Sequence, residues 1–277
     1  MYQFNFNNFT LQVDANHVID MVDGLDGLDV RTSSDPLTGQ DGGNIWAQNY
    51  AMRTITIGGS LFSTDFTSYY VLRDQLLNAF TIKVGRQLLT ITRPDGVQKL
   101  IYAKVNGRVQ LQETSGEVME AKFQILLTCE NPFLIDTVTQ TGSALITSGS
   151  GTPILSVVPT PMIQMQGNEV IITNNGDVAG YANMTIYGNI TNATVTKMQT
   201  GEHFTITDTL VDGETVNLYK NTQGLFVVNN LSGNAFSTFG GVFFTIEPGV
   251  NNIRFTAANS DSQALLKVTF NNLYLGM

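Results

Sequence analysis

The chain has 277 residues, which is enough for one large domain or two domains of ordinary size. Charged residues make up 13% of it and apolar residues 42%, which excludes a disordered chain, because disorder requires few apolar residues and many charges. A net charge of −9 argues against a nucleic-acid binder, since contacts to phosphates come from Lys and Arg.

Amide and hydroxyl side chains supply the polarity that charge does not, and they are unevenly distributed. Residues 134–277 contain 16 of the 25 Asn, 21 of the 33 Thr and 13 charged residues, whereas residues 1–133 contain 24 charged residues. Between the two parts, residues 137–161 include several Gly and Pro with little periodicity, which is typical of a connector or an extended crossing strand. We therefore predict a domain at 1–135, a linker or crossing segment at 136–165, and a second domain at 166–277.

One segment of the first part has helical periodicity. Within Phe66–Phe80, apolar residues recur three and four positions apart, as in an amphipathic helix, and Ser, Thr and Asp residues at 63–68 offer N-caps. Before it, residues 52–57 alternate between apolar and polar up to Gly58 and Gly59, which predicts a strand.

Strands are predicted after the helix. Leu88–Thr92 and Gln98–Tyr102 flank Arg93–Gly96, where Pro presets φ and Gly allows a positive φ, so a hairpin is expected. A longer hairpin follows, with strands Tyr102–Gln112 and Val118–Thr128 and a turn at Thr114–Gly116.

The second half consists of short strands separated by Asn, Asp and Gly turns. The predicted strands are 170–173, 182–187, 194–198, 203–207, 215–219, 225–229, 242–246, 252–257 and 264–270. This spacing predicts a β-sandwich or jelly roll, so the whole chain is expected to be mainly β with one α-helix.

Features of targeting and redox chemistry are weak. No stretch approaches the roughly 20 apolar residues that span a bilayer, and Met1–Phe6 lacks the basic and apolar regions of a signal peptide, so cytoplasmic synthesis is expected. The single cysteine, Cys129, cannot form an internal disulfide and is interpreted as a small buried residue in a strand.

The residues themselves predict no catalytic, cofactor or metal site. His17 and His203 are the only histidines, one in each predicted domain, and no His or Cys spacing suggests zinc. The segment Gly39–Gly43 lacks the Lys-Ser/Thr of a phosphate-binding loop.

Two groups of residues admit a binding hypothesis. Asp20, Asp23, Asp26 and Asp29 could bind calcium, but their spacing of three differs from that of an EF-hand, and a solvated loop is the favoured interpretation. A sugar-stacking platform could form from aromatic residues, although core or subunit packing is favoured for them. These aromatic residues are Trp46, Phe226, Phe236, Phe239, Phe243 and Phe244.

The order of motifs in the first part resembles the distal tail protein (Dit) family of long, flexible-tailed bacteriophages. The segments that carry this resemblance are Gly27–Arg31, Pro36–Gly43, Arg53–Gly59, the Tyr69–Leu76 helix and Leu127–Phe133. They are similar in order to the N-terminal ring-forming domain of that family.

The resemblance continues through the second part and so covers nearly the whole chain. Gly213–Leu218, Phe244–Ile253 and the final Leu266–Tyr274 strand resemble the galectin-like β-sandwich of the family, and Pro248–Asn251 resembles its Pro-Gly-x-Asn turn. The second part departs from expectation in being poor in charge.

The resemblance implies a structural role without enzymatic activity. The family's N-terminal domains form a homohexameric ring that joins the tail tube protein to the tail-tip, hub or baseplate proteins, and its galectin-like domains project outward. Genome DNA would pass through the channel without specific binding, and the net charge suggests the hypothesis of an acidic lumen that repels it. The location would be the virion tail tip, with no membrane partner. The alternative is a carbohydrate-binding adsorption protein that acts through the C-terminal sandwich.

Overall fold

Runs of alternating apolar and polar residues form most of the strands of this mainly β protein. The computed structural model describes residues 1–113, 119–146, 165–166, 168–221, 223–260 and 264–277. The chain forms two compact units, of which the first comprises Met1–Thr137 and Tyr274–Met277 and the second Val138–Leu273. Each unit has its own apolar core.

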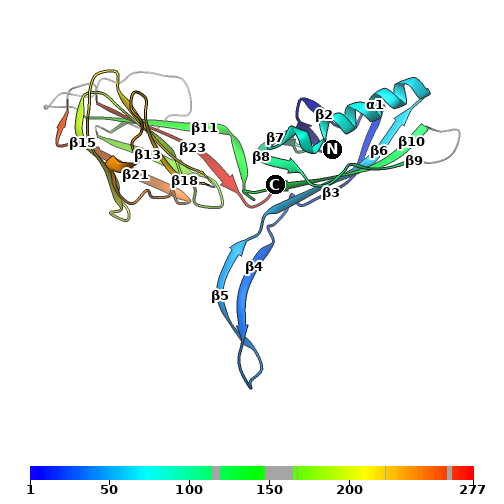
Figure 1. The fold of residues 1–277 in the computed structure, drawn as a ribbon, viewed down its shortest axis with the longest axis horizontal. Helices are drawn as coiled ribbons and strands as arrows, with labels where there is room; N and C mark the ends of the chain where they lie inside the picture. The colour runs from blue at the N-terminus through cyan, green and yellow to red at the C-terminus, as the bar shows by residue number, and fades with distance from the viewer. Residues whose placement is uncertain (114–118, 147–164, 167, 222, 261–263) are drawn as a thin grey trace. The chain divides into compact units, whose positions relative to one another are not determined.

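The first unit contains β-strands and one α-helix that lies to one side of them (Figure 1). Its elements are β1 (Gln3–Phe6), β2 (Phe9–Leu11), β3 (His17–Asp23), β4 (Val30–Pro36), β5 (Gly43–Tyr50), β6 (Arg53–Ser63), α1 (Phe66–Ala79), the 3-10 helix η1 (Ile82–Val84), β7 (Gln87–Thr92), β8 (Gln98–Val105), β9 (Gln110–Glu113) and β10 (Met119–Cys129).

Strand β6 is central to one sheet of this unit. It pairs antiparallel with β10 on one side and with β3 on the other, and β10 also pairs with β9 and with the end of β8. The strand runs through Gly58 and Gly59 to Ser63, further than the alternation predicted. A Cβ atom on Gly59 would lie 2.0 Å from the carbonyl oxygen of Val18 and 2.7 Å from the ring of Phe123, so the close approach of the neighbouring strands requires glycine there.

The helix predicted at Phe66–Phe80 is confirmed as α1. The carboxylate of Asp65 caps it, accepting the backbone N–H three residues later at 2.8 Å. Leu76 is fully buried in the core of the unit, and the ring of Phe80, just after the helix, stacks on that of Phe6 with 5.2 Å between centroids. The apolar face of the helix therefore packs against the strands.

The first predicted hairpin is confirmed as β7 and β8, whereas the second differs from the prediction. Tyr102–Gln112 is not one strand, because β8 ends at Val105 and β9 begins at Gln110. Gly107 has a φ of +84°, which breaks the extended conformation between them. The predicted turn at Thr114–Gly116 lies outside the described residues.

Two strands connect the units along the chain. β11 (Leu134–Leu145) begins in the first unit and continues into the second, and β23 (Leu265–Tyr274) leads back, so the last four residues belong to the first unit. Part of the segment 136–165 is thus strand β11, while residues 147–164 lie outside the described part of the chain.

The second unit consists of two sheets that share one core. Its remaining elements are β12 (Met165–Gln166), β13 (Glu169–Asn174), β14 (Asn183–Tyr187), β15 (Ile190–Lys197), β16 (His203–Leu210), β17 (Thr215–Asn221), β18 (Gly224–Asn229), β19 (Gly233–Asn234), the 3-10 helix η2 (Phe236–Thr238), β20 (Phe239–Gly241), β21 (Gly249–Thr256) and β22 (Asn259–Ser260).

The strand order gives the sandwich that the spacing predicted. One sheet has the order β19-β18-β17-β14-β23-β11 and the other β12-β13-β21-β15-β16-β20, with β22 beside β15. The strand predicted at 242–246 is wrong: β20 ends at Gly241, and Ile246 forms only an isolated bridge with Gly180. Phe243 and Phe244 are consecutive and both buried, which an alternating strand does not permit.

Buried asparagines build the turns of this unit. The side chain of Asn251 donates to the carbonyl oxygens of Glu247 (2.7 Å) and Gly249 (3.0 Å) and accepts the N–H of Glu247 (3.0 Å). Asn174 and Asn229 are equally buried and bind neighbouring backbone groups in the same way. The amide-rich composition of the second half therefore satisfies much of the turn backbone with neutral groups, beside one buried cation, Lys197, which donates to the carbonyl oxygen of Thr245 at 2.8 Å.

Candidate functional site

A hairpin arm, defined as β4 and β5 together, is the most exposed feature of the first unit. The two strands pair only with each other, and every one of their residues is exposed. Figure 1 shows them running away from β3 and β6 of the same unit. The exposed residues include Ile45 and Trp46, with 62% and 69% of their surfaces accessible.

An isolated two-stranded hairpin is marginally stable in water, because it lacks a core to bury its side chains. Within the arm, the indole N–H of Trp46 donates to the carboxylate of Asp35 at 2.9 Å, but the ring itself stays in solvent. Val30 and Tyr50, which pair at the base, are also largely exposed. Although its apolar residues are few, an arm that exposes Ile45 and Trp46 to solvent is typical of an assembly surface.

The base of the hairpin arm is held firmly. Arg53, the first residue of β6, is buried, and its guanidinium donates to the carbonyl oxygens of Gly24, Pro132 and Leu275. Burial lowers the pKa of this guanidinium, although Cys129 and Asp26 act in the opposite direction. One cation therefore ties together the loop before the arm, the loop after β10 and the segment after β23.

The sheet around β6 ends in two strand edges. Strand β3 pairs only with β6, and its Asp20, Met21 and Asp23 are exposed; the register with β6 shifts between Ile19 and Met21, so Asp20 forms a bulge. At the other side, β9 pairs only with β10. Among the described residues, both outer edges therefore lack a strand partner and present backbone N–H and C=O groups for pairing.

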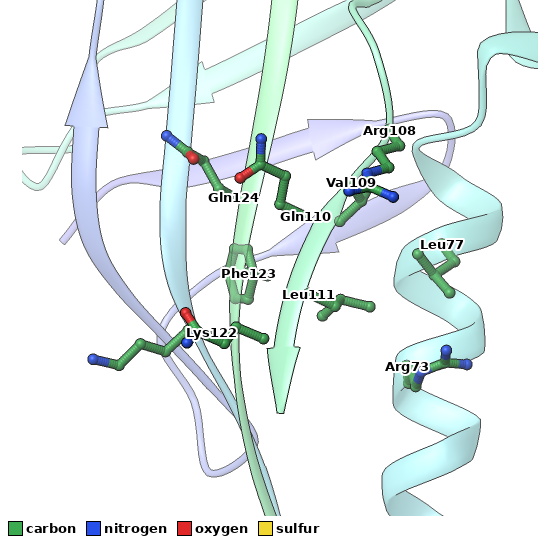
Figure 2. A pocket seen from close by; sticks show the side chains of 10 residues that line it. Arg73, Leu77, Arg108, Val109, Gln110, Leu111, Lys122, Phe123 and Gln124 are labelled. Carbon is green, nitrogen blue, oxygen red and sulfur yellow. The ribbon is translucent and has the colours of Figure 1, made fainter. Parts of the chain in front are cut away.

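A cleft of about 600 Å³ lies beside β9, between it and α1 (Figure 2). Its apolar wall consists of Leu77 from α1 with Val109, Leu111 and Phe123 from the β9–β10 side. Its polar lining comprises Arg73, Arg108, Gln110, Gln112, Lys122 and Gln124, with no carboxylate among the lining residues. In an acidic protein this cleft is a local basic surface.

The two histidines lie in different units and share no site. His17 is buried, with its Nδ1 3.1 Å from the carboxylate of Asp14, while its Nε2 has no hydrogen-bond partner among the described residues. Burial raises the pKa of Asp14, but hydrogen bonds from Asn16 and His17 outweigh it and leave that pKa lowered. His203 is exposed on β16, and its Nδ1 lies 3.2 Å from the carbonyl oxygen of Gly201.

The other residues singled out from the sequence are also placed apart. Cys129 is fully buried, and this burial raises the pKa of its thiol to about 12, as suits a small apolar residue. Within the described residues, no group of three or more His, Cys, Asp or Glu could hold a metal ion, Asp20 to Asp29 included. The segment Gly39–Gly43 closes the end of the hairpin arm.

The aromatic residues considered for a sugar platform do not gather on a surface. Phe243 and Phe244 belong to the core of the second unit, and their rings contact that of Phe204. Phe236 is half exposed beside Phe239, and Trp46 belongs to the first unit. The platform interpretation is therefore wrong for the two buried rings.

The hairpin arm was missed by the residue-level reasoning. Its strands carry few apolar residues, and the alternation that marks a buried face is absent because neither face is buried. The signal available was the Pro36–Gly43 segment, whose Gly39 and Gly42 have positive φ and form the connection between the strands.

Comparison with known proteins bears on the fold. No protein-family model and no curated protein sequence matches the chain. The described helices include none long and apolar enough to span a membrane. The crystal structure of the Dit protein of phage SPP1, described as a paradigm of the hub adsorption apparatus of phages infecting Gram-positive bacteria, matches with a TM-score of 0.71 and 10% identity over 99% of this chain and 100% of that one.

A second solved structure, from the baseplate of phage P2 in its activated conformation with calcium, matches with a TM-score of 0.51 and 12% identity. It covers 97% of this chain and 98% of that one. The match to SPP1 Dit extends through both units and is not confined to the sandwich. Across nearly its whole length, the chain therefore has the fold of a Dit-type distal tail protein.

Proposed function

We propose that this protein is a non-enzymatic structural component of a phage tail, in which N-terminal units assemble into a homohexameric ring. The observation that carries the proposal is the hairpin arm, whose exposed Ile45 and Trp46 require a partner surface. The likeness of the whole fold to a phage hub protein supports the same role.

The two strand edges support a ring in particular. A cyclic ring uses two different surfaces on each subunit, which meet in head-to-tail contacts that close on themselves. The outer edges of β3 and β9 are two such surfaces on opposite sides of one sheet. Pairing between copies would satisfy backbone groups that would otherwise invite aggregation.

In this proposal the ring joins the tail tube protein to tail-tip, hub, baseplate or receptor-binding proteins at the virion tail tip. Its central channel lets genome DNA pass without specific binding. The net charge of −9 favours an acidic lumen, which would repel phosphates and keep the genome from adhering.

Native mass spectrometry and electron microscopy of the purified chain test the proposal. A ring with six times the mass of the 30.2 kDa chain is expected, alone or on addition of the tail tube and tail-tip proteins. A protein that stays monomeric at micromolar concentration with both partners present would contradict it. Hydrolysis of peptidoglycan by the pure protein would contradict the non-enzymatic part.

A further inference from the structure

A short segment far along the chain completes the first unit. We call residues 274–277 the clasp; they belong to the first unit although they follow the whole second unit in sequence. The backbone N–H of Met277 donates to the carbonyl oxygen of Leu25 at 3.0 Å, and the carbonyl oxygen of Leu275 accepts from the buried guanidinium of Arg53. The clasp therefore contacts residues on both sides of the hairpin arm in sequence.

The side chain of Tyr274 is a second anchor of the clasp. Its hydroxyl donates to the carboxylate of Asp136 at 3.1 Å, and the ammonium of Lys99 lies 3.4 Å from the centroid of its ring. Lys99 and Asp136 also form an ion pair with each other at 3.7 Å. Together with Met277, the Tyr274 ring packs against the apolar core of the first unit. Packing, charge and hydrogen bonds thus hold the clasp together.

Close backbone contact leaves no room for a side chain at Gly276 of the clasp. A Cβ atom there would lie 2.4 Å from the carbonyl oxygen of Asp26 and 3.0 Å from its carbonyl carbon. A larger residue would therefore push the clasp away from the loop that contains Asp26. Gly27 belongs to the same loop, but its Cβ position has open space around it.

The loop that the clasp holds is the one from which the hairpin arm departs. It runs from Gly24 to Asp29, between the end of β3 and the start of β4. The base of the arm is closed by the backbone N–H of Ala51, which donates to the carbonyl oxygen of Asp29 at 2.8 Å. Because a lone hairpin gains little stability from its own contacts, the arm depends on how its base is held. Without the clasp, the base would lose the contact at Leu25 and one of the three carbonyl acceptors of Arg53.

Sequence order makes the clasp late during synthesis. The rest of the first unit lies in residues 1–137, and 136 residues, from 138 to 273, separate it from the clasp. Since chains are synthesised at about 5–20 residues per second, this separation delays the clasp by roughly 7–30 s. During that interval the first unit has every residue except those of the clasp.

Folding of the second unit favours seating of the clasp. Strands β11, by which the chain leaves the first unit, and β23, by which it returns, are neighbours in one sheet. The side-chain amide of Gln140 on β11 donates to that of Asn272 on β23 at 3.1 Å. Once this sheet has formed, the long loop between the two strands is already closed. In a chain with an unfolded second unit, the clasp would have to bear the entropy of closing that loop.

We propose that the clasp is a folding checkpoint, which fixes the base of the hairpin arm only after β23 has joined the sheet of the second unit. The first unit then becomes competent to assemble. The assembly part rests on the proposed function, whereas the effect on the arm base rests on the contacts of the clasp itself. Such coupling would keep unfinished chains, in which the arm is already made, out of the assembly.

Hydrogen exchange at the base of the arm tests the clasp by itself. In Gly276→Val the exchange rate at Ala51 should rise about tenfold, because the added side chain displaces the clasp and the base opens more often. Gly27→Val is the matched control, since its side chain meets open space, and should exchange like the wild type. Equal exchange at Ala51 in the two variants would overturn the role of the clasp.

A variant of the second unit tests the checkpoint. Val268 is fully buried on β23, opposite Met184 of β14, so Val268→Asp should open the sheet around β23. Exchange at Ala51 should then rise as it does in Gly276→Val, while β7 and β8 of the first unit stay protected. Continued protection of Ala51 while β23 exchanges freely would overturn the checkpoint. Loss of protection throughout the first unit would overturn the local action of the clasp.

Assembly provides a separate readout. Gly276→Val should raise the subunit concentration at half-assembly about tenfold, because only the clasped fraction of the protein assembles, and Gly27→Val should leave it unchanged. An unchanged value in Gly276→Val would overturn the link between the clasp and assembly. Wild-type protein that never forms rings, even with its tail partners, would overturn the proposed ring, while the exchange results still decide whether the clasp holds the arm base.

Discussion

The exposed edge strands of the two units differ in length. In the second unit the edge strands β12, β19 and β20 are two or three residues long, whereas in the first unit the edge strand β3 has seven residues and the hairpin arm is exposed along both strands. Short edges are a common protection against unwanted pairing. Of the two, the first unit therefore presents the longer terminal edge strand and the fully exposed hairpin.

The units also differ in how they satisfy polar groups that are buried. The first unit places the cation Arg53 among three backbone carbonyls. The second buries the cation Lys197 against one backbone carbonyl and uses neutral amides such as Asn251 at its turns. Amides satisfy the same backbone groups without the cost of burying a charge.

Removal of Arg53 is expected to change the stability difference between the two units the most. Arg53→Met leaves three carbonyl oxygens without their donor, and we expect the first unit to lose about 3 kcal/mol or more of stability. Urea unfolding followed by hydrogen exchange of each unit measures the loss. The control, Arg254→Met, removes a cation paired with Glu169 at a half-exposed site of the second unit, and should cost much less. Equal effects of the two variants would contradict the anchoring role.

The corresponding change in the second unit is Asn251→Ala. It removes three hydrogen bonds of the Glu247–Asn251 turn, and a loss of about 2 kcal/mol is expected, confined to the second unit. The exposed Asn259→Ala serves as the control and should change stability little. If hydrogen exchange showed that the first unit opens instead, the inference that Arg53 and Asn251 stabilise different units would be wrong.

Changing the hairpin arm sharpens the comparison, because it should affect assembly without affecting folding. Trp46→Asp removes an exposed apolar side chain and adds a charge, so the concentration at half-assembly should rise about tenfold or more. Analytical ultracentrifugation measures this shift. Leu231→Asp, equally exposed but in the second unit, should leave assembly unchanged. Lower thermal stability of Trp46→Asp as a monomer would argue that the arm has a structural role instead.

The smallest expected effect concerns the β7–β8 turn. The side-chain hydrogen bond from Arg93 and the backbone N–H of Val97 lower the pKa of Asp95 to about 2. Because the folded-state pKa is lowered, the stabilisation is present above the ordinary pKa near 3.8 and is lost as the pH falls towards about 2. Asp95→Asn and Arg93→Gln should each reduce the change of the unfolding midpoint with pH between these two values. A double variant flatter than either single one would mean that another group is responsible.

Local sequence patterns predicted most of the elements in the described residues. The periodicity at Phe66–Phe80 led to α1, and the Arg93–Gly96 turn led to the β7–β8 hairpin, because the backbone of each depends on neighbours in the chain. The wrong strand predictions lie where contacts between distant parts of the chain determine the backbone conformation. Phe243 and Phe244 enter the core together, and β6 continues through glycines that β3 and β10 require.

Sequence periodicity could not predict the candidate site. The hairpin arm has no buried face and hence no alternating pattern, and the basic cleft unites α1 with residues more than thirty positions away in sequence. The order of weak motifs did identify the fold, since the resemblance drawn from them agrees with the match to SPP1 Dit.

The sequence by itself determined that this protein is β-rich, sparsely charged and divided in composition, because those properties follow from residue types and local spacing. Only the tertiary structure decided which strand edges stay open, and that β3 and β9 lie at opposite edges of one sheet. An edge is defined by the absence of a neighbour, and neighbours in a sheet come from distant parts of the chain.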